Sequence, residues 1–287
     1  MVISGVSIYV NSDAVKGFPD STLYTTLKNS VAGLALLAPL AFSPVRRNEL
    51  RKLTRRQWPL LLAVSLIGGS VPYALYFRGL QRSTPVTASL IDHAQFLIVA
   101  LAALAFLRER LGAGVWVSLA VLFAGLSAGV AANAVRLDAG VAFLAAGTVL
   151  FAADFVLMKY LLRGVPSFVV ITFKLCVGSV LLLAYVAITG HLGLAASLSL
   201  LQWGYVVVTG LVLLAFTISS VVGLRHASAT AVTAIPAASP LVTTLLVLIA
   251  RGGSLSPVRL LGLLAVLAAL VAVFILGRRR ESRARPA

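Results

Sequence analysis

Long apolar stretches, separated by short polar or Pro/Gly-marked breaks, follow one another along almost the whole chain. A helix that spans a membrane needs roughly 20 mostly apolar residues, with about 17–25 tolerated. Ten segments meet this length, and they lie at residues 2–18, 22–42, 58–78, 85–106, 114–133, 140–161, 167–189, 203–223, 230–250 and 257–277. Runs such as 97–104 are apolar all round, whereas membrane β-strands alternate. The pattern predicts an all-α integral membrane protein with ten transmembrane helices.

The first segment is the most polar of the ten, because Asn11, Asp13 and Lys16 fall within it. Either this helix is short, or its first turn precedes the printed start. It has no basic leading region or cleavage site of the kind that marks a signal peptide.

Composition excludes a soluble fold. Apolar and aromatic residues make up 60% of the 287 residues, and only 11% are charged, against about 25% in ordinary soluble domains. A soluble protein of this length has too little interior to hide so much apolar surface. The one cysteine, Cys176, excludes an intrachain disulfide and a multi-cysteine metal site. We expect neither a metal nor a cofactor.

Basic residues give the chain a net charge of +16, and their positions predict its orientation. Counted from the N-terminus, the even-numbered gaps between segments and the C-terminal tail hold 16 basic residues, and the odd-numbered gaps hold 6. Basic residues in short loops stay in the cytoplasm. We therefore expect both termini to be cytoplasmic in a cell (inner) membrane. Contact with membrane lipids explains the charge, so no nucleic-acid partner is predicted.

The two halves of the sequence resemble each other. Helices 4–5 align with helices 9–10 without gaps at an offset of 144, and upstream segments align after a one-residue slip. Aligned pairs are Thr84 with Ser228, Ser89 with Thr233, Ile91 with Ile235, Leu111 with Leu255, and Lys28 with Lys174. We place the units at 1–135 and 136–278, followed by a basic tail at 279–287. Because each unit has an odd number of helices, five, the second unit enters the membrane in the opposite direction, as in many secondary transporters. Chance similarity between Leu/Ala-rich helices is the alternative.

Several local features are similar to those of the EamA family of the drug/metabolite transporter superfamily. They are the passage 73–80, the Leu107-Arg108-Glu109-Arg110-Leu111 end of helix 4, Ala238-Ser239-Pro240 in helix 9, and a lysine some eight positions after the proline that opens helices 2 and 7. The resemblance implies a ten-helix carrier, in a family that moves amino acids, nucleobases, sugars, choline-like cations and drugs, mostly outward in bacteria. Two positions depart from the pattern. Phe96 stands where helix 4 often has a proline, and Gly253 stands opposite Glu109.

Polar side chains in the middle of helices 4 and 9 are the first candidates for substrate binding, because the bilayer penalises them. At 100° per residue Ser89, Asp92 and Gln95 share one face of helix 4, and His93 lies at its edge. The aligned face of helix 9 carries Thr233, Pro236 and Ser239. For Asp92 the alternative is a structural bond to Lys28 or a tyrosine hydroxyl.

Asp92 and His93 are also the candidates for proton coupling. A carboxylate in a low-dielectric site takes up a proton more readily than in water, and histidine titrates near neutrality. Facilitated diffusion without coupling is the alternative.

The family resemblance implies that helices 1, 3, 4, 6, 8 and 9 line the transport path. Asn11, Asp13 and Asp154 therefore become substrate-binding candidates. Tyr73 is a candidate for stacking on a planar or cationic ligand, with anchoring at the membrane interface as its alternative. For Tyr76, nearer the end of helix 3, we favour anchoring.

A third group of residues is assigned structural or gating roles. Lys28 and Lys174 stand at matching depths near the entrance of helices 2 and 7, where lysines extend toward headgroups. Glu109 lies in a charged helix end. Pro236 and Pro240 each free a backbone carbonyl inside helix 9.

The sequence thus predicts a secondary transporter that exports or exchanges small polar metabolites, with amino acids and related compounds first on resemblance alone. A multidrug or organic-cation exporter is the alternative, because Asp13, Asp92 and Asp154 offer anionic partners. An ion channel and an intramembrane enzyme are less favoured alternatives to a carrier. No Gly-x-x-x-x-Gly-Lys loop for ATP occurs. Either a monomer or a homodimer fits.

Overall fold

Helices and short helical turns make up the computed structural model of the chain, which describes residues 2–83, 85–108, 116–121, 123–124, 138–236, 239–251, 257, 261, 264–265, 267–268 and 271. The elements before residue 108 are α1 (Val2–Ala14), η1 (Val15–Gly17), α2 (Ser21–Phe42), α3 (Pro44–Arg51), α4 (Gln57–Ile67), α5 (Val71–Arg82), α6 (Pro85–Ala102) and η2 (Ala103–Leu107). Those after residue 138 are α8 (Ala139–Leu161), α9 (Ser167–Thr172), η3 (Phe173–Val177), α10 (Gly178–Ile188), η4 (His191–Ser197), α11 (Leu200–His226), α12 (Ala229–Ala234) and α13 (Ser239–Arg251). The fold class is all-α, as the sequence predicts.

Side-chain caps fix where several long helices begin. The Asp20 carboxylate accepts a hydrogen bond from the backbone of Leu23 at the start of α2, and Asp138 does the same at the start of α8. Ser199 and Gln202 form a reciprocal capping box that opens α11. These bonds satisfy amide donors that have no partner within the helix.

Five helical stretches of the described chain are long and apolar enough to cross a membrane: Ser21–Phe42, Gln57–Arg82, Ala139–Leu161, Ser167–Ile188 and Leu200–His226. Each overlaps a segment predicted from the sequence. The predicted segments 114–133 and 257–277 lie mostly outside the described residues. The count of ten helices therefore stays a prediction.

Two predicted segments are interrupted in the structure. The segment 58–78 forms α4 and α5 with a break at residues 68–70, because Gly68 and Gly69 end α4 and Pro72, which has no amide hydrogen, opens α5. The segment 230–250 forms α12 and α13, and Pro236 follows the end of α12. The basic gap after α2 is also ordered, as the short helix α3.

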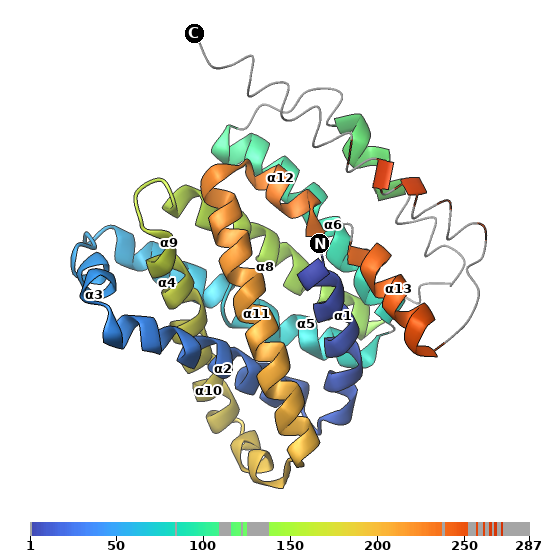
Figure 1. Ribbon diagram of the computed structural model, residues 1–287, viewed down its shortest axis with the longest axis horizontal. Helices are drawn as coiled ribbons and strands as arrows, with labels where there is room; N and C mark the ends of the chain where they lie inside the picture. Colours follow the sequence, from blue (N-terminus) through green and yellow to red (C-terminus); the bar gives the residue numbers. More distant parts are fainter. Residues whose placement is uncertain are drawn as a thin grey trace.

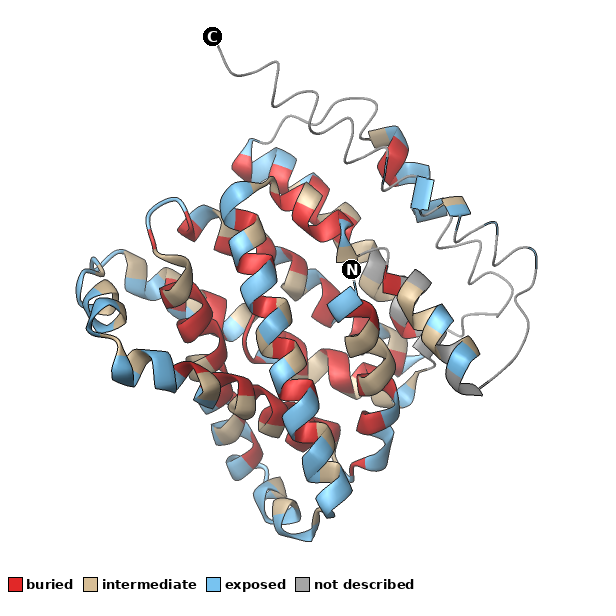
Figure 2. Cartoon of the chain, viewed as in Figure 1, coloured by how far each residue is buried: buried red, intermediate tan, exposed pale blue. Residues whose placement is uncertain are grey.

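The helices cross one another at a range of angles (Figure 1). The long helix α11 packs across α2, α1 lies beside α13, and α5 packs along α8. Glycines allow the closest approaches, since a side chain at Gly210 would come within 2.7 Å of the backbone oxygen of Lys28 on α2. Buried residues are spread over the inner parts of the crossing helices, whereas α3 has no buried residue (Figure 2). Many exposed side chains are large and apolar, which suits a surface that faces lipid.

Candidate functional site

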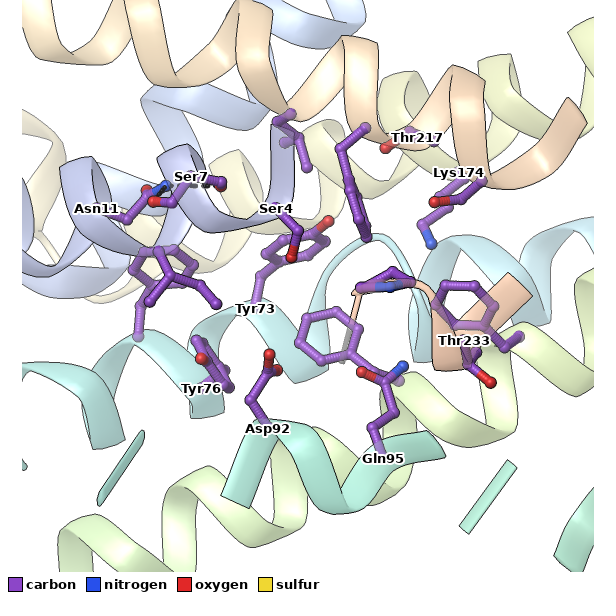
Figure 3. Close-up of a pocket in the computed structure, with 18 of the residues that line it drawn as sticks. Ser4, Ser7, Asn11, Tyr73, Tyr76, Asp92, Gln95, Lys174, Thr217 and Thr233 are labelled. Carbon is purple, nitrogen blue, oxygen red and sulfur yellow. Dashed lines mark hydrogen bonds between the residues drawn. The ribbon is translucent and has the colours of Figure 1, made fainter. Parts of the chain in front are cut away.

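A cavity of about 140 Å³ lies among the helices (Figure 3). A water needs about 10–15 Å³ by this measure, so the space holds on the order of ten waters, or a compound of amino-acid size. Its walls come from α1, α2, α5, α6, α8, η3, α11 and α12. The polar or ionisable residues that line it are Ser4, Ser7, Asn11, Lys28, Tyr73, Tyr76, Asp92, Gln95, Lys174, Thr217, Ser220 and Thr233.

The structure brings part of the predicted site together. The predicted residues that line the cavity are Asn11, Tyr73, Asp92, Gln95, Thr233 and Pro236. Three others are placed elsewhere: Asp13 is exposed on α1, Asp154 is paired away from the cavity surface, and Ser239 is fully buried outside the lining. The side chains of Ser89, His93 and Pro240, and all of Glu109, lie outside the described part of the chain.

Helix α6 supplies the acidic side of the cavity. Asp92 and Gln95, three residues apart on one face, both extend from α6 into the space (Figure 3). The Asp92 carboxylate forms no hydrogen bond or ion pair with any residue that the structure describes. A carboxylate held inside an apolar protein without a bonded partner is costly unless a ligand, water or proton meets it.

Aromatic rings form a second wall. Tyr73, Tyr76 and Phe77 come from consecutive turns of α5, and Phe151 faces them from α8. The ring centroids of Tyr73 and Phe151 are 4.9 Å apart, and those of Tyr76 and Phe151 are 6.0 Å apart. Tyr76 therefore lies in the interior and not at an interface, where the sequence favoured placing it.

Lys28 extends from α2 into a pocket of amide and aromatic groups. Its ammonium donates a hydrogen bond to Asn11 Oδ1 over 3.1 Å and lies 3.8 Å from the centroid of the Phe77 ring. The Tyr24 hydroxyl also donates to Asn11 Oδ1, over 2.8 Å. The amide nitrogen of Asn11 donates to the backbone oxygen of Ser7 over 2.7 Å, so the amide is held in one orientation.

Lys174, at the matching position of the second half, has a charged partner. Its ammonium donates to Asp154 Oδ2 in a buried ion pair between η3 and α8, and it lies 3.8 Å from the sulfur of Met158. The π-helical turn η3 carries this lysine, and the Ser65 hydroxyl of α4 donates to the backbone oxygen of Phe173 in the same turn over 2.8 Å. The pair holds α8 to η3 beside the α4–α5 break.

Sequence reasoning missed several cavity residues. It assigned Lys28 and Lys174 structural or gating roles, and both line the cavity. It overlooked two pairs of hydroxyl side chains: Ser4 and Ser7, which lie on α1 with the predicted Asn11, and Thr217 and Ser220 on α11. Their spacing of three and four residues along apolar helices was a usable signal.

Within the part of the chain that the structure describes, no three or more histidine, cysteine, aspartate or glutamate side chains lie together in a group that could hold a metal ion.

Comparison with known proteins identifies the family. The model of the EamA-like transporter family matches residues 1–128 and again residues 138–275. The chain belongs to the EamA-like transporter family. It is a multi-pass membrane transporter and not an enzyme, and its substrate is a small molecule. The family resemblance noted in the sequence is thereby confirmed.

Solved structures support the fold of this EamA-like protein. Among 29 matching chains, one crystal structure of a protein has a TM-score of 0.73 and 21% identity, over 97% of each chain. At this identity the likeness shows the fold alone. No curated protein matches the sequence.

Proposed function

We propose that the chain is a secondary transporter that exports or exchanges small polar metabolites, chiefly amino acids or related compounds, by alternating access. The observation that carries this proposal is a cavity inside an apolar helical protein whose walls include polar and ionisable side chains. Residues 1–128 and 138–275, the two stretches matched by the family, both contribute to its walls. A site shared between two halves is what alternating access requires, because each half can then move while the substrate stays bound.

The proposed topology has ten transmembrane helices in two inverted repeats, at 1–135 and 136–278, with both termini cytoplasmic in the cell (inner) membrane. Two lysine contacts support the repeat. Lys28 on the second helix bonds to Asn11 on the first, and Lys174 on the seventh predicted segment bonds to Asp154 on the sixth. Equivalent helices of the two halves thus carry equivalent contacts. This makes chance similarity a poorer explanation of the sequence alignment.

A second candidate is export of organic cations or drugs. It is favoured by the Asp92 carboxylate, which has no bonded partner among the described residues, and by the aromatic wall of Tyr73, Tyr76 and Phe151. Aromatic faces and a carboxylate together suit a cationic ligand.

Counterflow in proteoliposomes tests the proposal. Purified protein is first screened for thermal stabilisation by amino acids, related metabolites and organic amines. Each compound that stabilises it is then loaded inside vesicles, and uptake of trace label from outside is measured. A carrier gives saturable uptake that internal substrate accelerates. Uptake that neither saturates nor responds to internal substrate, for every compound bound, would contradict a carrier.

Two aspartate variants connect transport to the cavity. Asp92→Asn is expected to lower counterflow about tenfold or more, because a lost hydrogen bond to a charged group costs about 1.5–3 kcal/mol. Asp13→Asn is the matched control, since Asp13 is exposed and does not line the cavity. Equal loss in both variants would separate transport from this site.

A further inference from the structure

The two lysines of the cavity differ in one respect that bears on substrate choice. Lys174 is bonded to a carboxylate, that of Asp154, whereas Lys28 is bonded to the neutral amide of Asn11. A carboxylate neutralises an ammonium group and an amide does not. Among the described residues, the lysine of the first half therefore lacks the carboxylate partner that the lysine of the second half has.

Among the described residues, the groups around Lys28 include no substitute for a carboxylate. The rings of Phe77, Tyr73 and Tyr24 lie around the ammonium, with centroids at 3.8, 5.6 and 5.8 Å. Ring faces attract a cation but accept no strong hydrogen bond. Of the three N–H groups on the ammonium, one is directed to Asn11, and no further acceptor bonds to the others within the described part of the protein.

Asn11 itself has no capacity left to compensate the charge. Its Oδ1 accepts hydrogen bonds from both Lys28 and Tyr24, and its nitrogen donates to Ser7. Lys28 is only 3% exposed, and it lines the cavity. Access to its ammonium is therefore through the cavity, where a bound substrate would meet it.

We propose that Lys28 is the anion-binding group of the cavity and takes the carboxylate of a substrate. The inference rests on the proposed function and deepens it. Lys28 on α2 and Asp92 on α6 offer one cationic and one anionic partner in the same space. A zwitterion satisfies both groups, whereas an organic cation gives the ammonium no anionic partner. Lys174 does not serve in this way, because Asp154 already neutralises it.

The test compares each amino acid with its carboxamide, which keeps the shape and the ammonium but loses the negative charge. Binding of the free acids and the amides to purified protein is measured by calorimetry, and transport by counterflow. For the wild-type protein, free acids are expected to bind at least about tenfold more tightly than their amides, the size of effect that one buried charged contact gives.

Lys28→Met is expected to abolish this preference, so that acid and amide bind within about twofold of each other. Lys16→Met is the matched control, since Lys16 is exposed in η1 and lies outside the cavity lining. It should keep the wild-type preference. A Lys28→Met protein that still prefers the free acid overturns the proposal.

Asn11→Asp provides a second route if Lys28→Met does not fold. It keeps the lysine and gives it the carboxylate partner that Lys174 has in the second half. The expected result is again loss of the preference for free acids, with relative gain for amides and amines. Preserved preference would contradict the role of Lys28.

Failure of the inference and failure of the proposed function give different results. Counterflow of amino acids and their amides at equal affinity in the wild-type protein leaves the carrier function standing and refutes Lys28 as the anion-binding group. If only organic amines bind and show counterflow, both the zwitterionic substrate and the amino-acid class of substrate are refuted. Preference for inorganic phosphate over the carboxylates would refute the assignment of a carboxylate.

Discussion

The Asp154 carboxylate lies wholly inside the protein at 0% exposure, where Lys174 donates to its Oδ2. Its other oxygen lies against Gly68 and has no hydrogen-bond partner among the described residues. Removing one member of a buried pair leaves the other charge uncompensated, which costs about 3–5 kcal/mol. We therefore expect Asp154→Leu to lower the free energy of unfolding by about that amount, measured by denaturation in detergent.

Asp154→Asn is the informative comparison. An amide at this position keeps an acceptor for Lys174, which is the arrangement that Asn11 gives Lys28 in the first half. The loss of stability should then be clearly smaller than for Asp154→Leu. In Asp154→Leu/Lys174→Met, where no charge remains, stability should recover in part. Equal losses in both single variants would mean that packing around the pair matters and its charge does not.

Asp92 carries the prediction about energy coupling. Asparagine has a similar shape but cannot bind and release a proton, so Asp92→Asn should transport at a rate that an imposed pH gradient no longer changes. Uptake into proteoliposomes with and without the gradient measures this. The Asp13→Asn protein should keep the dependence of the wild type. Full gradient dependence in Asp92→Asn would remove Asp92 from the coupling step.

For single residues, the sequence predicted which side chains line the cavity better where helix faces decide it than where a long side chain reaches the cavity. Asp92 and Gln95 could be placed together because their spacing alone puts them on one face of a helix. Lys28 and Lys174 could not, since a lysine at that depth reaches either the headgroups or the interior. Which of these occurs depends on partners from other helices, such as Asn11 and Asp154.

Among the elements, the break between α4 and α5 matters most to the site. Gly69 lies in this break, where a Cβ would overlap with the backbone oxygen of Lys174 and come within 3.0 Å of Gly178. Since backbone cannot move aside as a side chain can, Gly69→Ala should destabilise the protein by about 1–3 kcal/mol. It should also weaken substrate binding, because η3 carries Lys174 into the cavity wall.

Gly204→Ala is the control for that substitution. Gly204 lies inside α11, and nothing approaches the place where its Cβ would stand. Replacing glycine with alanine inside a helix usually stabilises it by roughly 0.5–1 kcal/mol. Thermal unfolding of the two variants should therefore shift in opposite directions. A Gly69→Ala protein as stable as wild type would show that η3 and α10 are free to move away from the break.

The apolar pattern of the sequence predicted the positions of the helices, but it predicted only some of the breaks within them. Pro236 was visible in the sequence as a feature that disturbs a helix, and α12 ends just before it. The π-helical turns η2 and η3 were not visible, because such turns are rare single-turn bulges inside α-helices. In η3 the backbone oxygen of Phe173 also accepts a hydrogen bond from Ser65, which is far away in the sequence. The break at Gly68 and Gly69 could be suspected from its glycines and Pro72, but its close approach to Asp154 and Lys174, which are far away in the sequence, could not.

For the whole molecule, the distribution of basic residues predicts how the protein is oriented in the membrane. Many exposed side chains are large and apolar, and polar and ionisable side chains from both matched stretches line the interior cavity. Basic residues are concentrated in the gap that forms α3, whereas η4 contains no lysine or arginine. If basic loops stay inside, α3 is cytoplasmic and η4 faces outward.

Cysteine labelling in whole cells tests this orientation. The single Cys176 is first replaced by serine, which keeps a donor toward the backbone oxygen of Gly33. Arg51→Cys at the end of α3 and Leu194→Cys in η4 are then treated with a maleimide that does not cross membranes. Leu194→Cys should react in intact cells, and Arg51→Cys only after the membrane is opened. Reaction of Arg51→Cys in intact cells, with protection of Leu194→Cys, would reverse the proposed topology. Labelling of both sites in intact cells would contradict an odd number of spans between α3 and η4, and with it the inverted arrangement of the two repeats.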